Sequence, residues 1–497
     1  MTGSQYLLNK KSMIKNLLFL LIPLVSFSQT TTIQERLFNS YDQFKEESIQ
    51  TRRFKHKDIQ PLIDSLKYVK GFEVSLLGES IQGRDISMIS VGQGDIDVLL
   101  WSQMHGDEST ATAAIFDIFN YLKADQALLK NLKVHFIPML NPDGAEVFTR
   151  RNAIGIDINR DALRLQSPES QILKNVRDSL QAEFGFNLHD QSKYYNAIKT
   201  DKPATISFLA PAFNIDKDIN ETRGNAMRII VKMNEVIQRY ARGHVGRYDD
   251  EFEPRAFGDN MQKWGTSTIL IESGGYPNDP EKQFIRKLNY ISILSAIHII
   301  STKSYLDARL DRYVSIPKND RKLYDLKIEN LSFSYLGLDF TVDLGIVYGE
   351  IENKNHSQFY CLGKISDIGD LSTHFGYEKL DASGYNFKIG ETYPKILSDF
   401  EQFKSLDFPS LLAQGYTSVS INDLPEEIKF TNYPMNIIDI GKIMVPKNNT
   451  MPKSPISLGT DATFLLSKND EVVYAVINGF IYSLADNKNN VKNGLVK

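Results

Sequence analysis

The sequence predicts a mixed α/β domain, with a partly parallel sheet and helices on both faces, followed by a smaller β-rich domain. In about the first 300 residues, short apolar segments alternate with longer segments whose apolar residues recur at helical spacing. This alternation is typical of a mixed sheet whose crossover connections are helices. After about residue 304 the helical periodicity fades into short alternating runs with Gly and Asn between them, which predicts strands.

The length and composition agree with two globular domains. The chain has 497 residues, of which 42% are hydrophobic and 24% charged, which is ordinary for a globular protein of more than one domain. A formal net charge of -4 gives no reason to expect nucleic acid or an anionic membrane surface as a partner. The single cysteine, Cys361, excludes a disulfide within the chain and a thiolate zinc cluster, so a metal site has to use His and carboxylate ligands.

The N-terminus has the pattern of a signal peptide. Lysines precede an apolar run at 17–25, and small residues then offer a cleavage point before Gln29. The run is too short to span a bilayer comfortably, although a retained anchor is the alternative interpretation, and the start is either Met1 or Met13. We predict that residues 1–28 are removed and that the mature protein is exported, either periplasmic or secreted, without a stable membrane anchor.

After the signal peptide we expect a lead-in at 29–54, the α/β domain at 55–303 and the β-rich domain at 304–497. Within the α/β domain, strands are predicted at 72–77, 85–91, 97–103, 132–140, 184–189 and 268–272. Helices with one apolar face are predicted at 109–123, 169–183, 221–241 and 280–302. The sequence Asn141-Pro142-Asp143-Gly144 predicts a turn after the fourth strand.

Three residues at the ends of predicted strands form a candidate zinc site. His105 and Glu108 follow the strand at 97–103, and imidazole nitrogen and carboxylate oxygen are both good zinc ligands. Of the eight histidines, His105 alone has a carboxylate three positions later. His189 ends another hydrophobic strand and is the natural third ligand. In sheets of this kind ligands gather at the carboxyl ends of the strands, so two His, one Glu and an open fourth position predict a catalytic metal site.

Glu272 is the candidate general base. It closes the otherwise apolar strand at 268–272, where a carboxylate is costly to bury unless it is paired or used. A carboxylate beside an activated water can accept a proton as the water attacks a carbonyl and deliver that proton to the leaving amine. Elsewhere in the sequence, the segment 150–161 brings three arginines near two amides, and the planar arginine guanidinium suits a carboxylate or a developing oxyanion.

Taken together, these motifs resemble the zinc carboxypeptidases of the carboxypeptidase A type. The resemblance covers about residues 55–303 and rests on Gly83-Arg84, His105-x-x-Glu108, Asn141-Pro142-Asp143-Gly144, Asn152-Ala153-x-Gly155-x-Asp157-x-Asn159-Arg160, His189 and Glu272. It implies one zinc ion held by His105, Glu108 and His189, with Glu272 as the general base.

The resemblance also implies roles for four further residues. Arg150 aligns with the arginine that polarises the scissile carbonyl and stabilises the oxyanion. Asn159 and Arg160 align with the pair that binds the terminal carboxylate of the substrate. The family uses a mobile tyrosine some twenty-odd residues before the base, and Tyr248 is the candidate.

The sequence departs from the digestive enzymes at several positions. Asp107 stands where those enzymes carry Arg, which is similar to bacterial branches, some of which cut peptidoglycan stem peptides. Asp161 and the pair Asp190-Gln191 also differ. The side-chain specificity therefore stays open, although Gly258 and Asp259 are expected to line the pocket that decides it.

The β-rich region has a second, weaker resemblance. Segments such as 325–330, 342–346, 380–384 and 459–479 look like the β-sandwich that frames amidohydrolase barrels. Ile389-Gly390-Glu391 stands where that family places a His-x-His metal pair, so we expect a structural or recognition role here and no second active site.

These observations predict an exported zinc metallocarboxypeptidase that acts on peptides. Two alternatives stay open: an amidase for the γ-D-glutamyl-diaminopimelate bond of peptidoglycan stem peptides, and a non-catalytic protein that binds peptides or cell wall. The complete ligand set and Glu272 argue against the second alternative.

Overall fold

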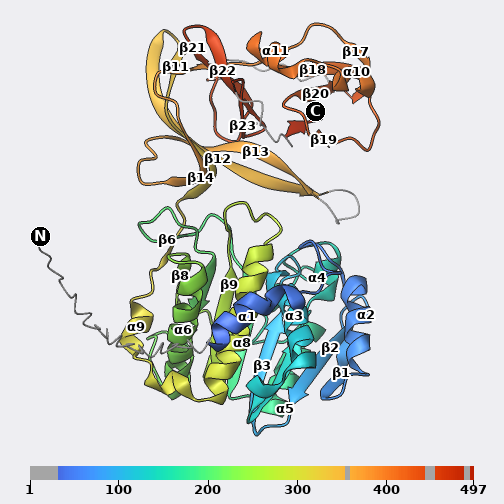
Figure 1. Cartoon of the computed structure of the whole chain (residues 1–497), viewed down its shortest axis with the longest axis vertical. Helices are drawn as coiled ribbons and strands as arrows, with labels where there is room; N and C mark the ends of the chain where they lie inside the picture. Colours follow the sequence, from blue (N-terminus) through green and yellow to red (C-terminus); the bar gives the residue numbers. More distant parts are fainter. Residues whose placement is uncertain (1–31, 353–358, 443–453, 486–492) are drawn as a thin grey trace, which may run out of the picture.

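The computed structural model describes residues 32–352, 359–442, 454–485 and 493–497. Figure 1 shows two parts, one above the other along the long axis of the molecule. The predicted signal peptide, residues 1–28, lies outside the described residues. Within the described ranges, no helix is long and apolar enough to cross a membrane.

The first part is built on an eight-stranded mixed sheet with the strand order β1-β2-β4-β3-β5-β9-β7-β8. Its centre is parallel, because β3 pairs in parallel with β4 and β5, and β5 pairs in parallel with β9. The pairs β1–β2, β2–β4 and β7–β9 are antiparallel. The strands are β1 (Phe72–Glu79), β2 (Asp85–Gly92), β3 (Ile96–Ser102), β4 (Leu132–Ile137), β5 (Phe184–Asp190), β7 (Ile206–Leu209), β8 (Val245–Arg247) and β9 (Ser267–Ser273).

Helices cover both faces of this sheet, as the sequence predicts. A large apolar core lies between one face and α1, α2, α3, α6 and α8, and a smaller core lies between the other face and α5 and α7. The helices are α1 (Ile33–Ser40), α2 (His56–Leu66), α3 (Thr110–Ala124), α4 (Pro142–Glu146), α5 (Pro168–Leu180), α6 (Glu221–Tyr240), α7 (Phe257–Lys263), α8 (Gln283–Ser301) and α9 (Leu310–Val314).

Several short elements of this part differ from the prediction. The predicted turn at residues 141–144 is the start of the short helix α4, because the Asn141 side chain accepts a hydrogen bond from the Gly144 amide and Pro142 fits the first helical position. The short strands β7 and β8 were not predicted, since each has fewer than five residues and no readable alternation.

A buried ion pair joins the lead-in to the helical layer. The Arg286 guanidinium in α8 contacts both oxygens of Asp117 in α3, and both side chains are almost completely buried. Arg286 also donates to the carbonyls of Glu46 and Ile49, and the Tyr41 hydroxyl donates to Asp117. The residues before the first strand are therefore part of this core.

The second part is β-rich, as predicted, and its larger sheet has the order β13-β12-β11-β15-β21-β22-β23, with β14 also paired to β11. Its strands are β11 (Leu323–Tyr335), β12 (Leu338–Glu352), β13 (Phe359–Gly369), β14 (Phe375–Asp381), β15 (Asn386–Lys388), β21 (Phe464–Lys468), β22 (Glu471–Ile477) and β23 (Phe480–Ser483). Beside it, a four-stranded parallel sheet packs with two short helices that the sequence did not predict. These elements are β16 (Glu391–Thr392), β17 (Leu397–Asp399), β18 (Tyr416–Asp423), β20 (Asn436–Asp439), α10 (Phe400–Lys404) and α11 (Phe408–Ala413).

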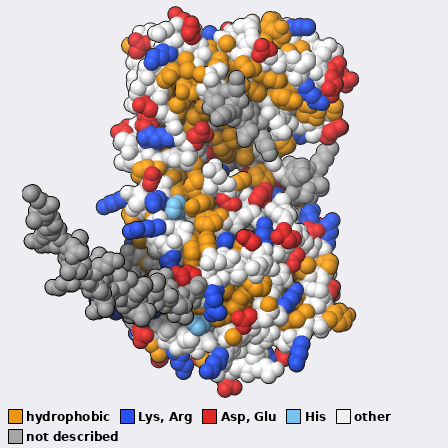
Figure 2. Space-filling model, in the orientation of Figure 1, with side chains coloured by type: hydrophobic (Ala, Val, Ile, Leu, Met, Phe, Trp, Pro, Cys, Tyr) orange, Lys and Arg blue, Asp and Glu red, His pale blue; other side chains and the backbone are white. Residues whose placement is uncertain are grey.

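The hydrophobic core of the first part continues past residue 303, where we placed the boundary. Tyr305, Tyr313 and Ile316 belong to that core. The chain then forms the short strand β10 (Asn319–Asp320), which pairs with β6 (Asn196–Ala197) of the first part, before it enters β11. On the face shown in Figure 2, side chains of both charge signs are interspersed over the two parts, without one dominant basic patch.

Candidate metal centre and active site

Three potential metal ligands converge at the carboxyl edge of the central parallel strands. His105 lies three positions beyond β3, Glu108 lies just before α3, and His189 lies near the end of β5. Because β3 and β5 are parallel neighbours, their ends meet at one edge. The turn between the two ligands needs Gly106, since a Cβ there would lie 2.0 Å from the backbone of Gly144.

The geometry of the three side chains fits one metal ion. His189 Nδ1 lies 3.1 Å from His105 Nδ1 and 2.6 Å from Glu108 Oε2, and His105 Nδ1 lies 2.8 Å from Glu108 Oε1. Tetrahedral zinc with ligand bonds of about 2.0–2.1 Å would separate its ligands by roughly 3.3 Å. The three distances between these atoms would therefore have to lengthen by about 0.2–0.7 Å. The two imidazole nitrogens that face each other are the atoms that would bind the ion.

Asp157 contacts His105, the first candidate ligand, on the side away from the cluster. Its Oδ1 lies 3.1 Å from His105 Nε2, which favours a proton on that nitrogen and leaves Nδ1 facing Glu108 and His189. Burial alone would lower the pKa of His105, but Glu108 and Asp157 raise that pKa to about 9, so a metal ion that binds at neutral pH would displace a proton from this imidazole. Burial likewise opposes ionisation of Asp157, yet His105 and Arg150 hold its pKa below the ordinary value, so it is a carboxylate at neutral pH.

The charge of Glu108 is also fixed by its neighbours. Burial would raise the pKa of Glu108, but the nearby His105 and His189 lower that pKa well below its ordinary value. The backbone N–H of Asp190 donates to Glu108 Oε2 at 3.1 Å, which adds a further contact that favours the carboxylate. Burial lowers the pKa of His189, so this imidazole stays neutral, as a metal ligand must be.

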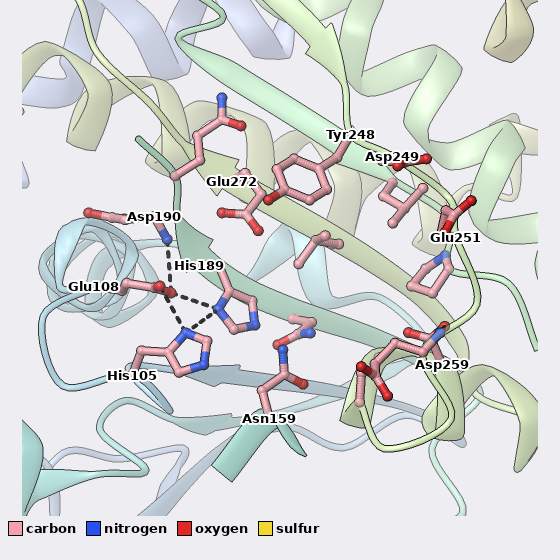
Figure 3. Close-up of a pocket in the computed structure, with 18 of the residues that line it drawn as sticks. His105, Glu108, Asn159, His189, Asp190, Tyr248, Asp249, Glu251, Asp259 and Glu272 are labelled. Atoms are coloured by element: carbon pink, nitrogen blue, oxygen red, sulfur yellow. Dashed lines mark hydrogen bonds and ion pairs between the residues drawn. The ribbon is translucent and has the colours of Figure 1, made fainter. Parts of the chain in front are cut away.

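Glu272 lies beside His189 on the adjacent strand, because β5 and β9 pair with His189 opposite Glu272. Burial, and then repulsion from Glu108, raise the pKa of Glu272 well above its ordinary value. Figure 3 shows its carboxylate on the cavity side, between the ligand cluster and Tyr248. A buried carboxylate with a raised pKa in a cavity is typical of a group that exchanges protons.

One cavity of about 360 Å³ collects the predicted site residues. Its lining includes the three ligands, the candidate base and the four side chains assigned by resemblance, together with Gly258 and Asp259: His105, Glu108, Arg150, Asn159, Arg160, His189, Tyr248, Gly258, Asp259 and Glu272. The structure thus brings every predicted site residue to one cavity, while the role of each stays a prediction.

The candidate substrate-binding side chains are held by specific contacts. Arg150 donates through Nε to Asp157 Oδ2 at 2.9 Å, and its side chain is 41% exposed, so it remains accessible to a ligand. Asn159 Oδ1 accepts from the Phe257 amide at 2.9 Å, so its Nδ2 group is the donor that it offers. Arg160 is paired with Glu253 at 3.3 Å at the edge of the cavity.

Residues that the sequence did not single out also belong to the site. Asp157 was part of the matched motif, but its contact with His105 was not foreseen. Tyr195 lines the cavity and packs edge-on against Tyr248, with ring centroids 6.0 Å apart. Asn187, which is buried with an unpaired side-chain oxygen, also lines it. No local sequence pattern marks Tyr195 or Asn187.

Comparison with known proteins finds a family match within the first part. Residues 63–221 match the family model of the zinc carboxypeptidases. Over this segment the chain is similar to a zinc carboxypeptidase domain. The matched segment contains His105, Glu108 and His189, the three side chains that converge in the structure. The resemblance of the β-rich part to amidohydrolases stays a prediction.

The relatives are distant. Carboxypeptidase SOL1 of Arabidopsis thaliana is 28% identical over 175 residues, covering 28% of this chain and 35% of that protein. An uncharacterized protein of Zymomonas mobilis is 25% identical over 137 residues, covering 26% of this chain and 36% of that protein. The chain thus matches about a third of the length of these relatives.

Solved structures of metallocarboxypeptidases are also similar. One from Burkholderia cenocepacia has a TM-score of 0.42 at 14% identity, covering 51% of this chain and 70% of that one. Carboxypeptidase A of Helicoverpa armigera has a TM-score of 0.41 at 15% identity, covering 57% of this chain and 80% of that one.

Proposed function

We propose that the protein is an exported, zinc-dependent carboxypeptidase that hydrolyses the C-terminal bond of peptides. One observation supports this most directly: two imidazole nitrogens and a carboxylate, with oxygen and nitrogen atoms that all lie within 4.8 Å of one another, share a cavity with the buried Glu272. One bound zinc ion would supply Lewis acidity, which polarises a carbonyl and makes a water easier to deprotonate.

Glu272 would carry the proton transfers. It takes a proton from the water that attacks the scissile carbonyl and then donates that proton to the nitrogen of the leaving residue. The raised pKa of Glu272, caused by burial and by Glu108, suits this exchange because the carboxyl group is then neither a very weak base nor a very strong acid. Tyr248, which lines the same cavity and lies next to Glu272 in Figure 3, would close over the substrate.

Arg150, Asn159 and Arg160 would position the substrate. Arg150, held through Nε by Asp157, has further N–H groups to donate to the oxyanion that develops on the carbonyl. The Nδ2 group of Asn159 and the Arg160 guanidinium would bind the terminal carboxylate, which a planar guanidinium can contact through two hydrogen bonds. This contact would make the enzyme require a free C-terminus.

The test is hydrolysis of N-blocked dipeptides with apolar, acidic or basic C-terminal residues by the purified full chain. We expect cleavage that a chelator abolishes and added zinc restores, and no cleavage of the same dipeptides with amidated C-termini. Cleavage of a γ-D-glutamyl-diaminopimelate peptide alone would instead support the stem-peptide amidase. If neither substrate class is cut with zinc present, the proposed activity is wrong.

Export is a separate element of the proposal. Its support is the basic, apolar and small-residue pattern of residues 1–28. The N-terminal sequence of the protein recovered outside the cytoplasm should begin near Gln29. Recovery of an uncleaved chain from the cytoplasm would contradict export and leave the proposed activity unaffected.

A further inference from the structure

The β-rich part and the connection that leads into it contact one loop of the candidate active site. This loop, residues 191–197, follows β5 and its ligand His189, and three of its residues line the cavity: Gln191, Ser192 and Tyr195. Its start, middle and end contact residues within 319–377, which lie beyond the core of the first part. The two sides of this contact are separated by more than a hundred residues in the sequence.

Asp325, at the start of β11, makes the central contact. It is 7% exposed, and its Oδ1 lies 2.6 Å from Lys193 Nζ while its Oδ2 accepts from the Tyr194 hydroxyl at 2.6 Å. The backbone N–H of Tyr348 donates to the same Oδ2 at 2.6 Å. A buried carboxylate with one cationic and two neutral donors is strongly held, so it fixes two successive loop residues against the β-rich part.

Tyr377 makes a second contact with the loop. Its hydroxyl donates to the Lys193 carbonyl at 2.6 Å. Gly275, three residues after Glu272, allows this approach, because a Cβ there would lie 2.2 Å from the Tyr377 hydroxyl and 2.7 Å from Lys193 Cβ. The β-rich part thus contacts the loop where the loop packs against the chain segment that follows the candidate base.

The two ends of the loop are fixed by the connection between the parts. Asn319 Nδ2 donates to Gln191 Oε1 at 2.7 Å, and residues 196 and 197 pair with β10. Tyr195, between these anchors, packs on Tyr248 across the cavity wall. Fixing residues on both sides of Tyr195 fixes the ring that faces the substrate.

We propose that the β-rich part completes the substrate cleft, with Asp325 and Tyr377 as positioning residues that hold loop 191–197 and place Tyr195 and Ser192 in the cleft wall. This inference rests on the proposed function for its catalytic consequence. The loop lines the cavity but supplies none of the three ligands, so its loss of order weakens substrate binding and leaves zinc binding intact. Misplacement of such binding groups by about 1 Å costs roughly tenfold to a hundredfold in kcat/KM.

The test compares Tyr377→Phe and Asp325→Asn in the full chain with Tyr324→Phe. The control removes a tyrosine hydroxyl whose bond to Asp367, at 3.0 Å, stays inside the β-rich part. Hydrogen exchange of the amides at 191–197 and the kinetics on an N-blocked dipeptide are measured together. We expect faster exchange in the loop and a KM raised by about tenfold or more in both variants, with kcat and bound zinc little changed, and neither effect in the control.

The outcomes separate the two proposals. Unchanged loop exchange in Tyr377→Phe and in every folded Asp325 variant overturns the positioning role. Faster exchange with an unchanged KM overturns the claim that the loop forms a wall for the substrate. If the unmodified chain hydrolyses no peptide, the proposed function fails, and loop exchange alone then decides whether the β-rich part holds the loop.

Discussion

Asp157 offers a sharp test of how the metal centre is built. Its Oδ1 contacts His105 Nε2 at 3.1 Å and accepts from the Asn159 amide at 3.0 Å, while its Oδ2 accepts from Arg150 at 2.9 Å. Asp157→Asn keeps the size of the side chain and removes its charge. The imidazole then loses the carboxylate that fixes its tautomer and raises its basicity. Changes of this kind weaken metal binding by about 10- to 100-fold, which corresponds to roughly 1.4–2.7 kcal/mol.

The assay is a zinc competition titration against a chromogenic chelator at constant pH. Asp143→Asn is the matched control, because Asp143 is also a buried carboxylate and its partners are Ser80, Gln82 and Arg84, none of them a ligand. We expect weaker zinc binding in the Asp157 variant alone. Equal zinc affinity in Asp157→Asn and the unmodified chain would refute the orienting role. An equal loss of zinc affinity in Asp143→Asn would show that the effect comes from a general destabilisation of the fold.

Two further predictions concern stability. Arg286→Met leaves the buried Asp117 without its cation, so the free energy of unfolding should fall by about 3–5 kcal/mol and the thermal midpoint by roughly 6–20 °C. The control Arg309→Met breaks an exposed ion pair and should shift the midpoint by at most about 4 °C. Equal midpoint shifts in the two variants would contradict the stabilising role of the buried pair. Burial raises the pKa of Asp259 from 3.8 to about 7, so its contribution to stability is complete below about pH 4 and lost as the pH rises to about 7. Between about pH 5 and pH 8, the free energy of unfolding should therefore fall less in Asp259→Asn than in the unmodified chain. An equal fall in both proteins would contradict this.

The α/β sheet and the convergence of the candidate site residues could be predicted because their signals are local. The strands that end near His105, His189 and Glu272 are apolar runs with clear boundaries, and parallel strands bring their carboxyl ends to one edge. Burying charged or imidazole side chains at those ends costs free energy unless they are paired or take part in binding or catalysis. The positions of the ligands therefore follow from strand boundaries and residue type, without knowledge of the tertiary contacts.

Other features depend on contacts between distant residues, which no local pattern encodes. The bond between Asp157 and His105 spans 52 positions, and that between Tyr194 and Asp325 spans 131. The helices α10 and α11 have five and six residues, too few to show helical periodicity. The helix at Asn141 was predicted as a turn because Asn, Pro, Asp and Gly also favour turns; only the bond from Gly144 to Asn141 distinguishes the two.

The central claim is that zinc and Glu272 act together in this cavity. The measurement that tests it most directly is zinc content and peptide hydrolysis of Glu272→Gln beside the unmodified chain. Because Glu272 is not one of the three converging ligands, the variant should keep its zinc, and loss of the proton-accepting carboxylate should lower kcat by about 10²- to 10⁴-fold. A variant that keeps both zinc and full turnover would contradict the claim, and so would one that loses its zinc.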